Sequence, residues 1–162
     1  MVLLPNEQLL NHVATPNDLA QVLGAFCGAA VDDTVLQATQ LRLAGNSHAA
    51  NREFAAAISA YTRALELQPR AGRHMLHSNR SAAHLQLGNK EAALADAQKA
   101  VELSPPDFQM SHIRLIDCLY ALGRYAEAAE ACRRADEKDS SFRFRSEFPA
   151  IKRALQAAGQ LV

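Results

Sequence analysis

Small and apolar residues recur at helical spacing through most of the chain. Between residues 54 and 65 they stand three or four positions apart, which places their side chains on one face of an α-helix. Pro69 and Pro105 follow two of these stripes, and a helix cannot continue through proline. The pattern therefore predicts an all-α protein built from amphipathic helices. The two clearest stripes are Phe54, Ala57, Ile58, Tyr61, Ala64 and Leu65, and later Tyr125, Ala128, Ala129, Cys132 and Ala135.

These stripes belong to a repeat. Gly88 and Gly123 stand five residues before Ala93 and Ala128 and mark a turn inside the unit. Two helices cross closely only where side chains are small, and a bulky residue at Ala57 would overpack such a crossing. Each unit is therefore predicted to be a pair of helices. A pair of alanines seven residues apart defines the repeat and returns after 36 and then 35 residues: Ala57 and Ala64, Ala93 and Ala100, Ala128 and Ala135.

The segment 141–162 is predicted to be a capping helix. Ser146 is expected to cap it, Pro149 to lie in its first turn and Gly159 to end it. A helix with one apolar and one polar face is what the last unit of a repeat array needs to close its core. The apolar stripe, with spacing of four, three and four, consists of Phe144, Phe148, Ile151 and Leu155.

Residues 1–35 differ in character and are predicted to form an acidic helical extension. A helix start is expected near Thr15, and Asp32 or Asp33 is expected to cap the first repeat helix. Residues 1–41 contain no Lys or Arg and carry a charge of −4. The extension is expected to pack against the first repeat. The alternative is that it covers the binding surface described below.

Composition narrows the class of protein. With 162 residues, 49% of them hydrophobic and 21% charged, the chain has the composition of one globular domain. Lys plus Arg equals Asp plus Glu, 17 each, so no general attraction to nucleic acid or to an anionic membrane is expected. The apolar run 19–31 is too short to span a bilayer, and the N-terminus lacks the basic region of a signal peptide. Cys27, Cys118 and Cys132 are far apart and odd in number, which favours a reducing, cytoplasmic location over a disulfide framework.

The sequence contains no recognisable catalytic motif. GxSxG, HExxH and a glycine-rich phosphate loop do not occur in it. His74 and His77 are three residues apart on one predicted helix, and His84 follows two turns later. A zinc site needs three or four converging ligands, and no cysteine or carboxylate is placed to complete one. These residues are therefore expected to be partly exposed helix histidines, and the chain is predicted to be no enzyme and to hold no metal or cofactor.

The repeat resembles the tetratricopeptide repeat (TPR). Unit one, residues 41–69, carries the family's signature residues, and the later units depart from them in part. Ser81 stands where unit two would have glycine or alanine. In unit three, Ile116 replaces that small residue and Ser140 replaces the terminal proline. The signature residues of unit one are Gly45, Ala57, Tyr61, Ala64 and Pro69.

The resemblance covers roughly residues 36–140 and implies a right-handed superhelical solenoid. Its three helix-turn-helix units would span about 36–71, 72–107 and 108–140, with the N-terminal extension before them and the capping helix after them. In such an array the first helix of each unit lines a concave surface that is suited to binding.

A subset of TPR domains resembles this chain more closely. It is typified by the co-chaperone that organises the seventy- and ninety-kilodalton heat-shock chaperones, and it holds a peptide's C-terminal Asp in a two-carboxylate clamp. That clamp has a basic residue and an asparagine on the first helix, an asparagine on the third, and a lysine and an arginine on the fifth. Met110 stands where the lysine would be, and Asp117 lies one turn beyond the arginine, so the resemblance implies weakened affinity. The implied peptide-binding residues are Arg42, Asn46, Asn79, Met110 and Arg114.

The implied function is a non-catalytic module that binds the acidic C-terminus of a protein, such as a chaperone tail ending Glu-Glu-Val-Asp. Two alternatives stay open at this point. The chain could be a scaffold that binds an internal peptide or helix without preference for a terminal carboxylate. It could also be a chain whose concave surface is filled by its own N-terminal segment. Fold alone does not decide between them.

Overall fold

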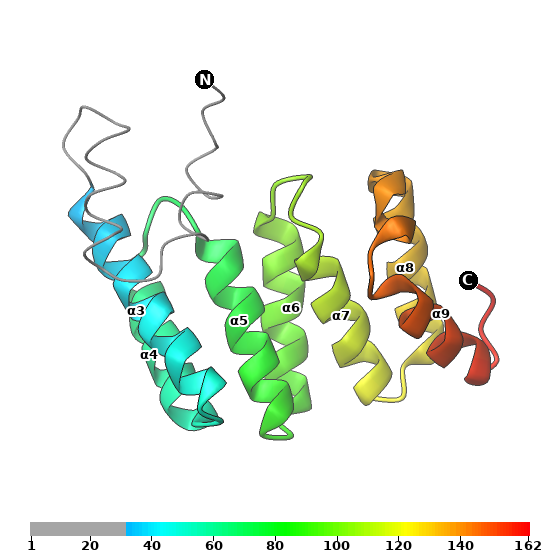
Figure 1. Cartoon of the computed structure of the whole chain (residues 1–162), viewed down its shortest axis with the longest axis horizontal. Coiled ribbons are helices and arrows are strands. Elements are labelled where there is room, and N and C mark those ends of the chain that lie inside the picture. Colours follow the sequence, from blue (N-terminus) through cyan, green and yellow to red (C-terminus); the bar gives the residue numbers. More distant parts are fainter. Residues whose placement is uncertain (1–31) are drawn as a thin grey trace.

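The computed structural model describes residues 32–162, which form seven α-helices and one short 3-10 helix without any β-strand (Figure 1). The all-α prediction is confirmed for this part of the chain. The expected helices within residues 1–31 lie outside the described residues. The helices are α3 (Asp33–Ala50), α4 (Phe54–Glu66), α5 (Arg73–Gln86), α6 (Lys90–Leu103), α7 (Met110–Ala121), α8 (Tyr125–Lys138), the 3-10 helix η1 (Ser140–Phe144) and α9 (Phe148–Ala157).

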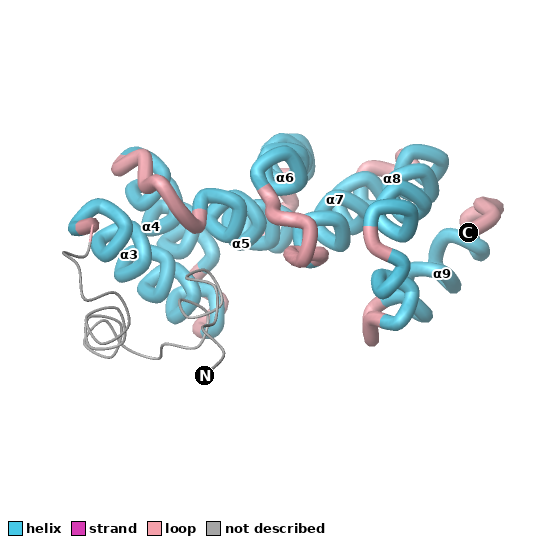
Figure 2. The backbone as a smooth tube through the Cα atoms, turned by 90° about the horizontal axis from the view of Figure 1, so that it is seen from above, coloured by secondary structure: helices cyan, strands magenta, loops and turns pink. Residues whose placement is uncertain are grey.

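The helices pair in chain order as α3–α4, α5–α6 and α7–α8, and the pairs stack side by side into a solenoid (Figure 1). Seen from above, α4, α6 and α8 lie along one side of the molecule and α3, α5 and α7 along the other (Figure 2). After the third pair, η1 and α9 follow at the C-terminal end of the stack. The first helices of the three pairs therefore share one face.

Local sequence explains where these helices begin and end. Asp32 caps α3, because its side chain accepts a hydrogen bond from the Thr34 backbone N–H at 3.0 Å. Gly88 and Gly123 make the turns inside the second and third pairs, with φ of +79° and +73°. Arg52 occupies the same turn of the first pair with φ of +63°, a left-handed conformation that costs a residue with a Cβ more than it costs glycine.

Alanines allow the close crossings that the repeat predicts. Ala57, Ala93 and Ala128 are all 0% exposed. Gly45 of α3 makes the closest approach, because a Cβ added there would lie 2.5 Å from the Tyr61 ring of α4. Around these crossings the apolar side chains gather in two clusters. The first includes Ala38, Tyr61, Leu76 and Ala83, and the second includes Leu94, Ile113, Leu119, Cys132, Phe142 and Leu155.

The predicted cap differs from the structure in two residues. Ile151 and Leu155 of α9 are buried and Phe148 packs against the second cluster, but Phe144 is 83% exposed. Phe142 takes its place with 1% exposure, because residues 140–144 turn as a 3-10 helix and the stripe does not run back through residue 145. Ser146 is not the N-cap, since α9 begins at Phe148 with Glu147 before it and no side-chain cap.

Pro149 in the first turn and Gly159 after the last agree with the prediction. No helix within residues 32–162 combines the length and the apolar character needed to cross a membrane.

Candidate functional site

The face shared by α3, α5 and α7 carries four polar residues that the resemblance assigned to ligand binding: Arg42, Asn46, Asn79 and Arg114. We call them the polar row. Arg42 and Asn46 come from α3, one turn apart, Asn79 comes from α5 and Arg114 from α7. Three different helices therefore supply the row, and the stacking of the three pairs determines its spacing.

Arg42 is the most buried member of the polar row, with 5% exposure. A cavity of about 10 Å³, comparable to the space that one water molecule needs, lies beside it between α3 and α5. Burial lowers the pKa of Arg42, and the nearby Tyr61 raises it by a smaller amount. Because the ordinary pKa of arginine lies far above 7, the guanidinium stays charged at neutral pH.

Asn46 and Asn79 are joined directly. The Asn46 side-chain carbonyl oxygen accepts a hydrogen bond from the Tyr61 hydroxyl at 2.7 Å and another from the Asn79 side-chain amide at 3.0 Å. Two donors on this oxygen hold the Asn46 side chain in one orientation, so its own amide group is directed elsewhere as a donor. The second hydrogen of the Asn79 amide is not used in the bond to Asn46 and can also donate. The pair therefore presents neutral hydrogen-bond donors.

Tyr61 links this pair to the two arginines. Its side chain is 2% exposed, and burial raises its pKa to about 12 although the charges of Arg42 and Arg114 act to lower it. The hydroxyl therefore stays protonated at neutral pH and remains a donor to Asn46. Both guanidinium groups are near enough to act on the Tyr61 phenol, which itself hydrogen-bonds to Asn46.

Arg114 is only partly engaged by its surroundings. Its guanidinium lies 3.9 Å from the carboxylate of Asp117 on the next turn of α7, a loose ion pair. Its Nε is buried and has no hydrogen-bond partner among residues 32–162. An unpaired buried donor is costly. The side chain as a whole is 30% exposed, so its terminal nitrogens, rather than Nε, are the part that could donate to a ligand's carboxylate.

Met110 behaves differently from the other four predicted residues. It begins α7, and its partly buried side chain packs against the second apolar cluster. The structure thus brings Arg42, Asn46, Asn79 and Arg114 together but gives Met110 an apolar environment. Sequence reasoning treated Tyr61 only as a signature core residue. Its hydrogen bond to Asn46 of the polar row was missed, although its position between Ala57 and Ala64 on the face toward α3 was a usable signal.

His77 has a structural partner on the neighbouring helix. His77 and Arg80 of α5 both contact the buried carboxylate of Asp96 on α6: His77 Nδ1 lies 2.9 Å from one oxygen, and Arg80 Nε and a terminal nitrogen donate to the two oxygens at 2.7 Å each. Arg80 also donates to Thr62 of α4 at 3.1 Å. The described residues contain no group of three or more His, Cys, Asp or Glu side chains that could hold a metal ion.

His74 corrects the expectation of partly exposed histidines. It is only 3% exposed, and its ring meets the Phe108 ring edge-on with 4.6 Å between centroids. The prediction of partial exposure was wrong for His74 because this residue lies on the side of α5 that meets the loop before α7. A helical pattern alone does not show which loops fold back onto a helix.

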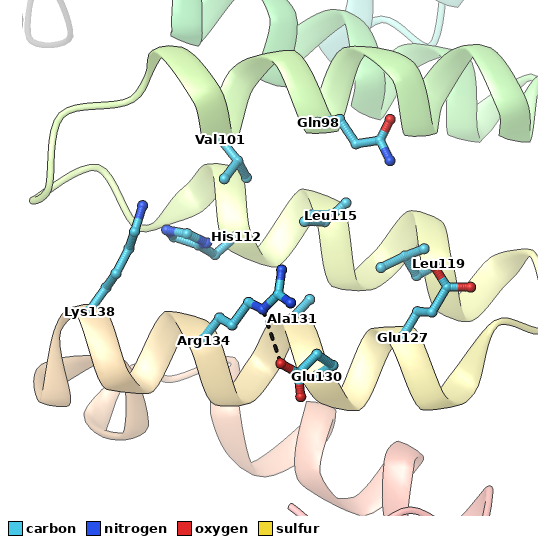
Figure 3. Close-up of a pocket in the computed structure, with 10 residues that line it drawn as sticks. All are labelled: Gln98, Val101, His112, Leu115, Leu119, Glu127, Glu130, Ala131, Arg134 and Lys138. Atoms are coloured by element: carbon cyan, nitrogen blue, oxygen red, sulfur yellow. Dashed lines mark hydrogen bonds and ion pairs between the residues drawn. The ribbon is translucent and has the colours of Figure 1, made fainter.

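A second cleft, of about 440 Å³, lies between α6, α7 and α8 (Figure 3). Its floor is apolar, with Val101 and Leu115, and its charged rim includes Arg134, whose Nε donates to Glu130 at 3.0 Å. His112 and Lys138 stand at one end (Figure 3). The cleft contains no member of the polar row.

Stacked helix pairs with polar residues on the face of the first helices define a helical-repeat binding module. More particularly, the chain belongs to the tetratricopeptide repeat family, whose model matches residues 42–108 and 78–141. TPR units are modules of protein interaction, and the prediction of this family is confirmed.

Relatives of the chain include co-chaperones. It is 37% identical to the Protein STIP1 homolog of Dictyostelium discoideum over 101 residues, which is 62% of this chain and 17% of the relative. It is 37% identical to the Small glutamine-rich tetratricopeptide repeat-containing protein 2 of Mycosarcoma maydis over 110 residues, 68% of this chain and 30% of the relative. The chain therefore spans less than a third of the length of either relative.

Solved TPR domains have the same fold. The TPR2B domain of yeast Sti1, in a structure described as its complex with pHsp70, superposes with a TM-score of 0.68 and 30% identity. The match covers 77% of this chain and 98% of that domain. The chain is thus a TPR domain similar to those of co-chaperones.

Proposed function

We propose that this chain is a non-catalytic module that binds the acidic C-terminal tail of a partner protein on the face shared by α3, α5 and α7. Heat-shock chaperone tails ending Glu-Glu-Val-Asp are the proposed ligands, by analogy with the yeast Sti1 domain described in complex with pHsp70. The proposed binding residues are the polar row together with Met110, which borders it on α7. The cytoplasm is the proposed location.

The observation that carries this proposal is the arrangement around the Asn46 side-chain oxygen. Tyr61 and Asn79 both donate to that oxygen, so the Asn46 amide is left as a donor, and the charges of Arg42 and Arg114 both act on the same Tyr61 phenol. Guanidinium groups and amide donors that converge in this way match the needs of carboxylates, which accept hydrogen bonds and carry negative charge. Because the donors are already oriented, little side-chain entropy is lost when a ligand binds.

The experiment is a calorimetric titration with a free-acid peptide ending Glu-Glu-Val-Asp and with the same peptide as its C-terminal amide. We expect the free acid to bind at least about tenfold more tightly, because one charged acceptor is lost in the amide. Asn79→Ala should weaken binding of the free acid by roughly 10- to 150-fold, the equivalent of one hydrogen bond to a charged group. Asn89→Ala, which removes an exposed asparagine outside the row, is the matched control and should change nothing.

Equal affinity for the acid and the amide would contradict the proposal. It would favour the alternative function, a scaffold that binds an internal peptide or helix without preference for a terminal carboxylate. Two observations favour that alternative: Met110 packs into the apolar cluster where the clamp lysine would stand, and Asp117 opposes the charge of Arg114. Circular dichroism should first show that Asn79→Ala retains its helices, since binding by an unfolded variant says nothing about the site.

A further inference from the structure

The part of the binding face on α7 carries little positive charge. A ligand tail made only of acidic residues would need more. Along α7, Met110, Arg114 and Asp117 follow one another at intervals of four and three residues, so they lie on one side of the helix. Met110 is neutral, and the single positive charge of Arg114 faces a carboxylate 3.9 Å away. Beyond Arg114, a ligand therefore meets negative rather than positive charge.

A cavity opens beside this carboxylate. It has a volume of about 210 Å³ and lies between α7 and α9, where α9 follows the stack at the C-terminal end of the molecule (Figures 1 and 2). Asp117 is its charged lining residue, and its side chain is 41% exposed. Apart from Tyr120, the other walls are aliphatic: Ile116 from α7, and Ala150, Ile151, Ala154 and Leu155 from α9.

Two charged neighbours, Arg114 and Glu147, act on Asp117. Burial raises the pKa of Asp117, Arg114 lowers it, and the nearby carboxylate of Glu147 raises it again. Glu147 has its own partner, Arg145, at 3.1 Å. Among residues 32–162, the ion pair of Asp117 is the loose contact with Arg114. A ligand carboxylate on Arg114 would compete for that contact. A cation from the ligand would restore the balance of charge at Asp117.

We propose that the cavity between α7 and α9 is a subsite for a lysine or arginine side chain of the bound segment, on the N-terminal side of the ligand's carboxylates. The aliphatic walls accommodate the methylene stem, and Asp117 receives the charged end. The Tyr120 ring at the rim adds a face suited to a cation. This inference rests on the proposed function, because it assumes that the carboxylate end of the ligand occupies the polar row.

The proposed ligand therefore has charge of two signs. Its terminal carboxylate lies among Arg42, Asn46 and Asn79, Arg114 holds the next acidic group, and a basic residue follows toward the N-terminus. Because neighbouring helices are about 10 Å apart and an extended chain advances about 3.3 Å per residue, the basic residue should lie roughly four to seven positions before the C-terminal Asp.

The test is a set of free-acid peptides ending Glu-Glu-Val-Asp in which each upstream position in turn is lysine, norleucine or glutamate. At one position we expect lysine to bind roughly 3- to 10-fold more tightly than norleucine, and glutamate more weakly than both, as for a partly exposed charge pair. Asp117→Asn should remove the difference between lysine and norleucine. Asp107→Asn, which removes an exposed acidic residue from the loop before α7 that is not part of the cavity, should leave the difference intact.

A second variant tests the cavity itself. Ala154→Phe fills it from α9, and it should abolish the preference for lysine while the free acid still binds better than the amide. If norleucine binds as tightly as lysine at every position, the subsite is not selective for a cation and the inference is overturned. If the acid and the amide bind equally, the proposed function fails instead. If the free acid binds better than the amide but lysine binds no better than norleucine, the subsite is overturned and the proposed function stands.

Discussion

Gly45 shows how single residues support the binding face. It lies where α3 passes over the Tyr61 ring, and that ring hydrogen-bonds through its hydroxyl to Asn46, the next residue of α3. The small residue therefore has two effects. It lets the two helices of the first pair approach closely, and it places the Tyr61 hydroxyl within reach of the amide that orients the polar row.

Gly45→Ala should destabilise the protein, although alanine is the better helix former. A Cβ at this position would lie 2.5 to 2.9 Å from three atoms of the Tyr61 ring, and the ring is 2% exposed, so it has little room to move. We expect the free energy of unfolding to fall by about 1–3 kcal/mol, as in overpacked cores. Urea denaturation followed by circular dichroism measures the change.

A double-mutant cycle with Tyr61→Leu isolates the contact. When the ring is removed, Gly45→Ala should be neutral or stabilising, because the intrinsic preference of alanine for helix then prevails. If Gly45→Ala instead raised the melting temperature of the otherwise unchanged protein, the close packing of the first pair would be disproved.

At the scale of helices, a buried ion pair joins α5 to α6. The Asp96 carboxylate on α6 is 5% exposed and receives both Arg80 and His77 from α5, while Arg80 extends to Thr62 on α4. Burial tends to raise the pKa of Asp96, but the hydrogen bonds from His77 and Arg80 and their charges outweigh burial and lower it. Asn79 stands directly before Arg80, so this contact also fixes the part of α5 that carries the polar row.

Asp96→Asn should lower the free energy of unfolding by about 3 kcal/mol at pH 7, because Arg80 would be left in a largely buried position without its counter-charge. The native pKa of Asp96 lies below the unfolded value of about 3.9, so its stabilisation is complete above that pH and is lost as pH falls through the native pKa. Between about pH 5 and pH 3 the unaltered protein should therefore lose more stability than the variant. Urea denaturation at several pH values provides the comparison.

Glu127→Gln supplies the control for this prediction. The pair of Arg124 and Glu127 has the same two-bonded geometry, at 2.7 and 2.6 Å, but both side chains are exposed. Because water screens such a pair, its loss should have little effect on unfolding. Equal effects of Asp96→Asn and Glu127→Gln would show that the contact between α5 and α6 contributes no more than a surface pair.

At the scale of the whole molecule, the C-terminal segment closes the solenoid through one of two phenylalanines. Phe142 is 1% exposed and meets Phe148 edge-on, whereas Phe144 is 83% exposed. Phe142→Ala should therefore lower the free energy of unfolding by about 3–5 kcal/mol, and Phe144→Ala should change it by less than about 0.5 kcal/mol. Thermal and urea denaturation of the two variants measure the effect of the same substitution at two positions. A larger loss of stability in Phe144→Ala than in Phe142→Ala would instead support the stripe predicted from sequence, in which Phe144 is buried.

The features that repeat along the chain could be predicted from the sequence alone. The alanines at positions 57, 93 and 128 could be placed in the core because a period and a helical spacing agree on them, and the family resemblance then located the polar row. Features that do not recur with a regular period could not be predicted in this way. Phe144 was mistaken for Phe142 because a change from α-helix to 3-10 helix leaves the spacing of apolar residues ambiguous. The contact between Arg80 and Asp96 joins residues 16 positions apart on different helices, and no local pattern indicates it.

The buried hydroxyl of Tyr61 also gives the protein an optical property. The chain has no tryptophan and three tyrosines, so its near-ultraviolet emission comes from tyrosine alone. The rings of Tyr120 and Tyr125 meet at a tilt of 60° with 5.0 Å between their centroids, far along the chain from Tyr61. Replacing both with phenylalanine would leave Tyr61 as the single emitter, hydrogen-bonded to Asn46 and under the influence of two arginine charges. Occupation of the polar row would then be visible as a change in intrinsic fluorescence, without any attached dye.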